Sequence, residues 1–411
     1  MTSPSTGYFR FIAENAPFVA AGALLSFLSV FGQTFFISIF GGEIRAEFGL
    51  SNGDWGGLYM IATLASAAVM VWAGGLADTF RVRSLGIVVV ALLGCACLAM
   101  AFNQSAFVLI LIIFVLRLMG QGMTVHISAV AMTRWFVSTR GRALAIAGLG
   151  FMLGEAILPL LMVWLKSLFG WRELWVCYGL FCFLMCPILG WLLRLERTPS
   201  AEASSDETLG LMGRHWTRAQ ALAHPLFWLM VPAIVSFSAF GTVFWFQQVV
   251  FAEIKGWSHF SLVAVFPLGT GALALSAVVY GWAIDRFGAT RLLPLYILPY
   301  VLAFILHWYA PTLAWTAFAV ILMGIAGGGH GTLLNACWAE FYGTRFIGSI
   351  KSAATALMVL GSALGPGLSG WLIDIGVGLE TQMLGFAATF VVASICLAFA
   401  ARIARGLPVP A

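Results

Sequence analysis

Twelve apolar stretches, each long enough to cross a lipid bilayer, constrain this sequence more than any other feature. A helix needs about 20 mostly apolar residues to cross roughly 30 Å of hydrocarbon. The stretches are 17–41, 55–77, 84–102, 106–132, 143–165, 174–193, 225–251, 260–284, 292–310, 313–337, 353–373 and 383–401. Their apolar residues are continuous rather than alternating, which disfavours a transmembrane β-barrel. The sequence therefore predicts an all-α membrane protein with twelve transmembrane helices.

Composition narrows the classes of protein that remain. Only 9% of the 411 residues are charged and 61% are hydrophobic, whereas soluble domains carry about 25% charged residues. So few charges cannot cover a water-soluble protein of this size, which excludes a cytosolic enzyme, a nucleic-acid-binding protein and a disordered scaffold. The sequence has no nucleophile motif or nucleotide loop, and its seven cysteines fall inside apolar stretches. We therefore expect no enzymatic activity, no cofactor and no bound metal.

Polar connections and basic residues predict the domains and the orientation. One long polar connection, 194–224, separates six spans from six, which predicts an N-terminal bundle (1–193), a cytoplasmic linker and a C-terminal bundle (225–411). Of the 21 Lys and Arg residues, 16 lie on the side of the termini and the linker, four on the opposite side, and Arg117 inside a span. Because basic residues concentrate in cytoplasmic loops, both termini are expected in the cytoplasm. The expected location is the inner, or plasma, membrane, with multiple passes.

The two predicted halves are related by an internal repeat. A shift of 207 residues superposes several glycines and three pairs of less common residues: Asp78 with Asp285, Pro159 with Pro366, and Trp164 with Trp371. Matches of this kind at one shift indicate two homologous six-helix halves. Parallel halves of this type are typical of transporters that expose a site to alternate sides of the membrane.

Two short loops, 74–83 and 281–291, share a pattern of glycine, aspartate and basic residues. Both resemble the loop signature of the major facilitator superfamily. The twelve spans, the two halves and the linker extend this resemblance over essentially the whole chain, and it implies the major facilitator fold. It also implies that Asp78, Asp285 and Arg286 form a conformational latch between neighbouring helices. The alternative is ordinary loop charge.

Two charged residues lie inside predicted spans. Arg117, in the fourth span, shares a helix face with Gln121 and resembles the superfamily's intramembrane arginine motif. Glu155, in the fifth span, is the one carboxylate in the middle of a span, and its expected depth in the membrane is similar to that of Arg117. A charge in the membrane is costly unless it is paired or hydrated, so both residues are functional candidates. An Arg117–Glu155 pair would be displaced by substrate or linked to proton transfer, or else would be a static pair of neutralised charges.

The superfamily resemblance places the first, fourth, seventh and tenth spans around a central substrate cavity. The residues predicted to bind substrate there are Gln33, Arg117, Gln121, Trp245, His330 and Asn335. Four hydroxyl residues extend the same polar stripes: Ser26, Ser29, Thr124 and Ser128. Glu155 and His330 are the candidate proton carriers, with a hydrogen-bonded structural histidine as the alternative for His330. The glycine-rich stretch 361–370 is expected to allow close helix packing.

Residues 134–141 and 342–352 further resemble the monocarboxylate and oxalate–formate branch of the superfamily. The eighth and eleventh spans carry no charge, which disfavours a dianion held by two cations. We therefore predict a secondary active transporter that moves a small, monocarboxylate-like anion by alternating access, coupled to protons or by exchange. An exporter of amphipathic drugs or metabolites by proton antiport is the alternative, and a non-transporting receptor is a third hypothesis. The expected partners are a small-molecule substrate, protons and the lipid bilayer, without nucleic acid, and the expected state is a monomer.

Overall fold

The computed structural model describes residues 8–136, 139–195 and 209–407 of the chain. Over these residues the regular secondary structure is helical, apart from one isolated β-bridge between Gly210 and Arg214. Eleven of the described helices are long and apolar enough to cross a membrane, by length and composition. The prediction of an all-α protein with many membrane-spanning helices is confirmed.

The ninth predicted span, 292–310, differs from the expectation of one continuous helix. Regular helix is found only in α17 (Leu298–Tyr309), after a turn at 293–297. Pro294 lies in this turn. Proline lacks an amide hydrogen and its ring clashes with the preceding helical turn, so a helix cannot continue through it without a kink. The apolar composition of the stretch predicted its location in the membrane correctly but missed this interruption.

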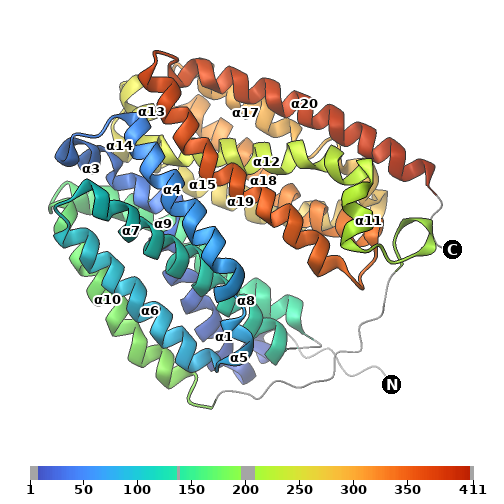
Figure 1. Ribbon diagram of the computed structural model, residues 1–411, viewed down its shortest axis with the longest axis horizontal. Helices are drawn as coiled ribbons and strands as arrows, with labels where there is room; N and C mark the ends of the chain where they lie inside the picture. The colour runs from blue at the N-terminus through green and yellow to red at the C-terminus, as the bar shows by residue number, and fades with distance from the viewer. Residues whose placement is uncertain (1–7, 137–138, 196–208, 408–411) are drawn as a thin grey trace. The chain divides into compact units, whose positions relative to one another are not determined.

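The described residues form two compact units. The first comprises residues 1–48 and 61–204 and the second residues 49–60 and 205–411, so helix α4 (Asn52–Ala73) contributes to both. The other elements of the first unit (Figure 1) are α1 (Tyr8–Leu28), η1 (Ser29–Gly32), α2 (Thr34–Ile37), η2 (Ser38–Phe40), α3 (Gly41–Phe48), α5 (Leu76–Thr79), α6 (Val82–Phe102), α7 (Ala106–Leu116), η3 (Arg117–Thr124), α8 (Val125–Trp135), α9 (Arg140–Lys166) and α10 (Trp171–Leu192).

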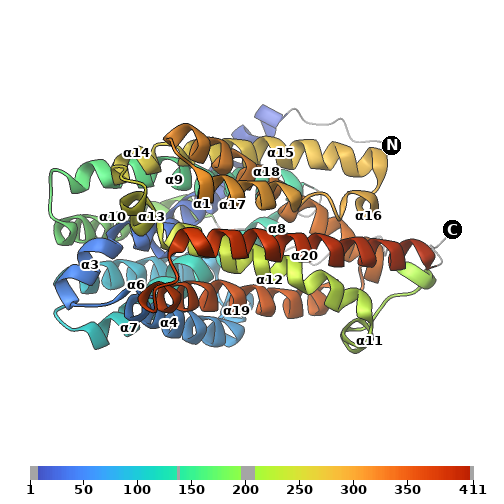
Figure 2. The ribbon, with the colours of Figure 1, turned by 90° about the horizontal axis from the view of Figure 1, so that it is seen from above.

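The second unit contains the remaining long helices and the end of the polar connection. Its elements are η4 (Leu211–Gly213), α11 (Arg218–Ala223), α12 (Pro225–Phe246), α13 (Gln248–Ile254), α14 (His259–Val263), α15 (Phe266–Phe287), α16 (Ala289–Leu292), α17, α18 (Leu313–Tyr342), α19 (Ile347–Asp374) and α20 (Leu379–Gly406). Helix α12 lies between α19 and α20 (Figure 2).

Close packing of α19 on α12 depends on two glycines of the glycine-rich stretch. A Cβ atom added at Gly361 would lie 2.6 Å from Ser238 Oγ, and one added at Gly365 would lie 2.6 Å from the carbonyl oxygen of Ala239. Ser238 Oγ uses this proximity to donate a hydrogen bond to the carbonyl of Met358 at 2.7 Å. The expected packing role of these glycines is confirmed, because any larger residue would push the two helices apart.

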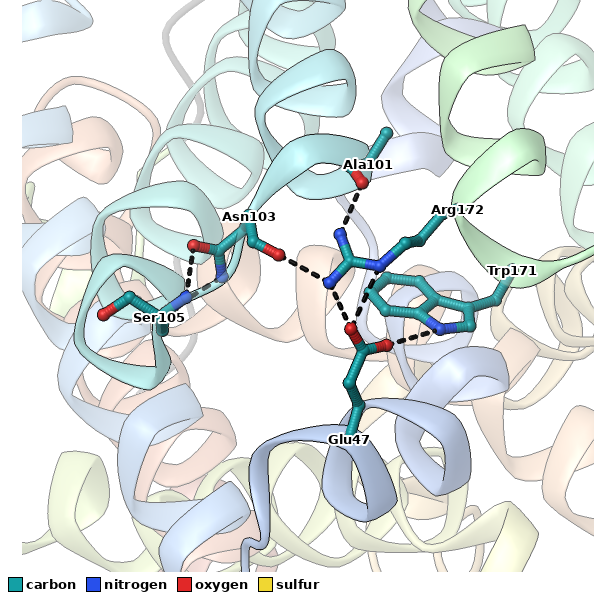
Figure 3. A network of polar contacts seen from close by, with 6 residues as sticks. All are labelled: Glu47, Ala101, Asn103, Ser105, Trp171 and Arg172. Carbon is teal, nitrogen blue, oxygen red and sulfur yellow. Dashed lines mark hydrogen bonds and ion pairs between the residues drawn. The ribbon is translucent and has the colours of Figure 1, made fainter.

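An ion pair at one end of the first unit joins three helices (Figure 3). Arg172, at the start of α10, binds the carboxylate of Glu47 near the end of α3. It also donates hydrogen bonds of 2.5 Å to the carbonyl oxygens of Ala101 and Asn103 at the end of α6. The hydrogen-bonded guanidinium lowers the pKa of Glu47. The contribution of the pair to stability is therefore present at neutral pH and is lost when the pH falls through that lowered pKa.

The second unit contains an equivalent junction with the charges exchanged. Lys255 follows α13, and its Nζ lies 2.6 Å from a carboxylate oxygen of Glu380, in the first turn of α20. The same Nζ donates to the carbonyl of Trp308, near the end of α17, at 2.9 Å. Trp308 follows Ala101 by 207 residues, which is the shift that relates the two halves of the sequence. The repeat thus extends to a three-helix junction that no match of residue types revealed.

The end of the polar connection is folded against the second unit. Trp216 is 2% exposed, and its backbone amide donates to the carbonyl of Tyr342 at 3.0 Å. Its indole ring packs edge-on against the Tyr342 ring, with the centroids 5.7 Å apart. Helix α11 follows with a complete capping box between Thr217 and Gln220. The described residues after 208 therefore form an ordered extension of the second unit, anchored at the end of α18.

Candidate functional site

Two irregular helical segments meet in the first unit. The first span is interrupted at Gln33, whose φ of −81° and ψ of 151° are extended, between η1 and α2. The fourth span contains the π-helical segment η3, a widened form of helix that often marks functional sites. A Cβ atom added at Gly120 of η3 would lie 2.6 Å from the Cα atom of Gly32 in η1. The two backbones are in direct contact, which only glycine allows at both positions.

Arg117 is the first residue of η3, and the break in the first span supplies its hydrogen-bond acceptors. The side chain is 2% exposed, and its Nη1 donates to the carbonyl of Gly32 and to Thr34 Oγ1, both at 3.2 Å. In an unbroken helix the Gly32 carbonyl would accept from the amide of Phe36. That amide instead bonds the carbonyl of Gln33 at 3.2 Å. The interruption therefore leaves a backbone oxygen available for a buried guanidinium.

The four hydroxyl residues expected to line a cavity are buried instead. Ser26 Oγ lies 3.0 Å from Ser128 Oγ, and Ser128 Oγ donates to the carbonyl of Gly22 at 2.8 Å. Ser29 Oγ donates to the carbonyl of Ser26 at 2.6 Å, and Thr124 donates to the carbonyl of Gly120. The expectation is corrected: these hydroxyl groups satisfy one another and the backbone at the contact of α1 with the fourth span, as buried polar groups must. Gln33 and Gln121, in contrast, keep part of their surface exposed.

Glu155 lies on α9, which packs against the same irregular part of the first span. Gly154, directly before it, approaches η1 so closely that an added Cβ atom would lie 2.6 Å from Val30 Cγ2. Glu155 is partly exposed. Segment η1 is thus contacted by η3, which carries Arg117, and by α9, which carries Glu155. Both intramembrane charges lie on elements that converge on one interrupted helix.

In the second unit, His330 lies in an aromatic cluster. Its ring stacks on that of Phe237 of α12, with centroids 3.7 Å apart and an interplanar angle of 6°. Its Nδ1 lies 3.3 Å from the hydroxyl of Tyr296, which is fully buried. The ring of Tyr300 packs edge-on against the other ring of this stack, that of Phe237, with the centroids 5.2 Å apart. The tenth-span histidine is therefore held in a fixed orientation between helices, with its ring stacked and one nitrogen hydrogen-bonded.

The other two candidates in the second unit lie apart from this cluster along their helices. Trp245 packs edge-on against Phe266 at 4.6 Å and is half-buried. Asn335 is exposed on α18, where its Oδ1 accepts a hydrogen bond of 2.6 Å from Lys351 Nζ of α19. The sequence pattern places Lys351 between two predicted spans, and its contact with α18 becomes visible only in the tertiary structure. It is a cation in the second unit that sequence reasoning missed.

The expected latch residues lie at the ends of helices that carry the signature loops. Asp285 and Arg286 are exposed at the end of α15, and the Asp78 side chain lies outside the described part of the chain. The fourth span holds the loop of Asp78 from two points: His126 Nε2 lies 3.0 Å from the carbonyl of Gly74, and Arg134 donates to the carbonyl of Ala77 at 2.7 Å. Movement of the fourth span would therefore be transmitted directly to this loop.

The first unit by itself offers a buried guanidinium, partly exposed amides and a carboxylate. The second unit by itself offers stacked aromatic rings, an imidazole and an ammonium group. Among the described residues, no group of three or more His, Cys, Asp or Glu side chains could hold a metal ion. A cation beside amides suits the binding of a carboxylate, and aromatic surfaces suit the binding of a planar ring.

The sequence matches one known protein family and is similar to several transporters. The family described as Major Facilitator Superfamily matches residues 22–366. A gallate transporter of Pseudomonas putida is 24% identical over 408 aligned positions, which cover 89% of each chain. A protein named "Probable sulfoacetate transporter SauU", of Cupriavidus necator, is 30% identical over 158 residues, a match that spans 38% of this chain and only 35% of that relative.

The fold also matches that of solved structures. A bacterial homologue of the human lysosomal transporter Spinster, whose crystal structure is described as inward-facing and unoccupied, superposes with a TM-score of 0.71 at 18% sequence identity. The superposition covers 98% of both chains. At this identity the likeness establishes the fold.

Proposed function

Because the chain belongs to the Major Facilitator Superfamily, a family of membrane transporters rather than enzymes, we propose that it is a secondary active transporter of small organic anions. The observation that carries the substrate class is Arg117. A guanidinium that is 2% exposed in a membrane-spanning segment is costly. Its position at the interruption of the first span, next to the partly exposed Gln33 and on the same segment as Gln121, suits a ligand for a carboxylate.

Within the organic anions, aromatic monocarboxylates are the proposed substrates. The second unit, taken by itself, contains the stacked pair of His330 and Phe237 and, further along the helix of Phe237, the indole ring of Trp245. Aromatic rings favour offset-stacked and edge-on contacts with one another, so such a surface suits a planar ring. One relative that aligns over most of this chain is a gallate transporter, and gallate is an aromatic monocarboxylate. Asn335 and Lys351 would offer further polar contacts to the substrate.

A thermal-shift screen tests the substrate class. Benzoate and hydroxybenzoates, added to the purified full-length protein in detergent, should raise the midpoint of unfolding by about 5 °C at saturation, because a ligand stabilises the state to which it binds. Tetraphenylphosphonium, a hydrophobic cation, should not. Stabilisation by the cation and not by the carboxylates would contradict the proposal and would favour the exporter of amphipathic compounds.

Proton coupling is proposed to depend on Glu155, with His330 as the second candidate carrier. In Glu155→Gln, accumulation of substrate driven by a pH gradient should fall to background in proteoliposomes, whereas exchange of labelled for unlabelled substrate should persist. The amide cannot release a proton but keeps the shape of the carboxyl group. Glu14→Gln, at an exposed glutamate paired with Arg10, is the matched control. An unchanged response to the pH gradient in Glu155→Gln would remove this residue from the coupling step.

Orientation, oligomeric state and conformational control complete the proposal. The predominance of Lys and Arg on the side of the termini supports a chain with both termini in the cytoplasm of the inner membrane. We propose that it works as a monomer by alternating access. Asp78, Asp285 and Arg286 are proposed as the latch, and the contacts of Arg134 and His126 with the loop of Asp78 support a role for this region in coupling helix movement.

A further inference from the structure

A pocket outside the proposed transport site lies between two helices of the first unit. Helices α6 and α10 run side by side (Figure 1). Where α6 begins and α10 ends, they enclose a pocket of about 440 Å³ whose lining includes Arg81, Arg83, Ser84 and Arg194. No Asp or Glu belongs to the described residues that line it. Three guanidinium groups line this one volume, which favours the binding of an anion there.

The arginines are positioned by the contact between the helices. Gly190 of α10 has no side chain, and a Cβ atom added there would lie 4.0 Å from both Nε and Nη2 of Arg83 and 3.3 Å from Ile87 Cδ1. The guanidinium of Arg83 therefore lies against the backbone of the facing helix. Arg194 is held from the other side, with its Cζ 5.5 Å from the ring centroid of Trp191. Both side chains line the space between α6 and α10 and also remain exposed to solvent.

The pocket continues into an apolar groove. An adjoining cavity of about 470 Å³ shares Arg83, Ile87 and Arg194 with the first, and its other lining residues include Pro187 and Trp191. The lining residue Trp191 is 61% exposed, and Leu184, further along α10, is 60% exposed. Exposed apolar side chains on a membrane-spanning helix face lipid. A cationic end joined to an apolar end matches a molecule with an anionic head and a hydrocarbon tail.

We propose that this pocket binds an anionic phospholipid, with the phosphate of the headgroup among Arg81, Arg83 and Arg194 and an acyl chain along the apolar groove. Guanidinium groups bind phosphate oxygens with paired hydrogen bonds. Basic pockets between membrane helices on the cytoplasmic side are suited to such headgroups, and the distribution of basic residues predicts that this end faces the cytoplasm. The apolar groove favours a lipid over a free phosphate ion, which would use only the cationic end.

The test measures lipid binding to delipidated, full-length protein. Phosphatidylglycerol in mixed micelles should raise the unfolding midpoint by about 5 °C, and native mass spectrometry should show bound lipid. Phosphatidylcholine with the same acyl chains should have little effect, since its headgroup has no net charge. Glycerol 3-phosphate and inorganic phosphate should also have little effect, because neither can occupy the groove. Equal stabilisation by these soluble phosphates would overturn the proposal in favour of a free anion site.

Two variants probe the pocket in different ways. Arg81→Gln/Arg83→Gln/Arg194→Gln should reduce bound phosphatidylglycerol about tenfold or more by removing the charge. Gly190→Leu keeps all three arginines but fills the space between the helices, and it should lower binding as well. Arg402→Gln/Arg405→Gln, at two exposed arginines near the end of α20, is the control and should bind lipid like the parent protein. Unreduced binding in the two pocket variants, or an equal loss in the control, would overturn the assignment to this pocket.

Discussion

Replacing Arg117 by Gln should lower substrate uptake at least about 100-fold while the protein still folds and inserts into the membrane. Loss of a buried charge from a charge-assisted contact costs several kcal/mol of binding free energy, and 2.7 kcal/mol corresponds to about a factor of 100. Folding should tolerate the change, because the Gln amide can still donate to the carbonyl of Gly32 or to Thr34, and because one buried charge disappears. The measurements are uptake into proteoliposomes and thermal unfolding of the purified variant.

Arg172→Gln is the matched control for this variant, and it should show the opposite behaviour. Its guanidinium joins Glu47 to the carbonyl oxygens of Ala101 and Asn103 (Figure 3), away from η1 and η3. Loss of these contacts should lower the unfolding midpoint, whereas uptake per folded molecule should stay near the parent value. Arg117→Lys should recover only part of the uptake, because a lysine keeps the charge but cannot form two parallel hydrogen bonds. Normal uptake by Arg117→Gln would exclude this residue from substrate binding.

Gly120→Ala should destabilise the protein strongly although it adds a single methyl group. The new Cβ atom would lie 2.6 Å from the Cα atom of Gly32 and 2.7 Å from its amide nitrogen. Both are backbone atoms of the interrupted first span, so neither can rotate away, and the two helices must separate. We expect a loss of about 3 kcal/mol of stability. A large loss of transport should accompany it, because the same contact positions the acceptors of Arg117.

Gly148→Ala on α9 is the control for this prediction, since a Cβ atom added there meets nothing within 4 Å. Alanine favours helix over glycine, so Gly148→Ala should be neutral or stabilising by up to about 1 kcal/mol. Thermal unfolding and uptake measured side by side would compare the two changes. Equal behaviour of Gly120→Ala and Gly148→Ala would show that the first and fourth spans do not contact one another at Gly32.

Several features of the candidate site could be found from the sequence because a single residue in its local context reveals them. Arg117 and Glu155 stand out as charges within apolar stretches. His330 stands out within a glycine-rich span, although its neighbours Phe237 and Tyr296 come from other segments. The polar stripe of Ser26 and Ser128 was misinterpreted, since its residues bind one another across a helix contact. Whether a polar side chain faces a ligand or a neighbouring helix depends on that neighbour, which the sequence pattern does not contain.

The sequence by itself determined that this chain is a bundle of membrane-spanning helices, because burial of apolar side chains in lipid depends on composition and length within each stretch. Only the tertiary structure decided which oxygens hold Arg117, since the Gly32 carbonyl becomes available when two backbones meet and the first span breaks. The same holds for Lys351 beside Asn335 and for the arginine pocket between α6 and α10. These groups lie on different helical segments, and only the packing of helices against one another brings their charges and acceptors together.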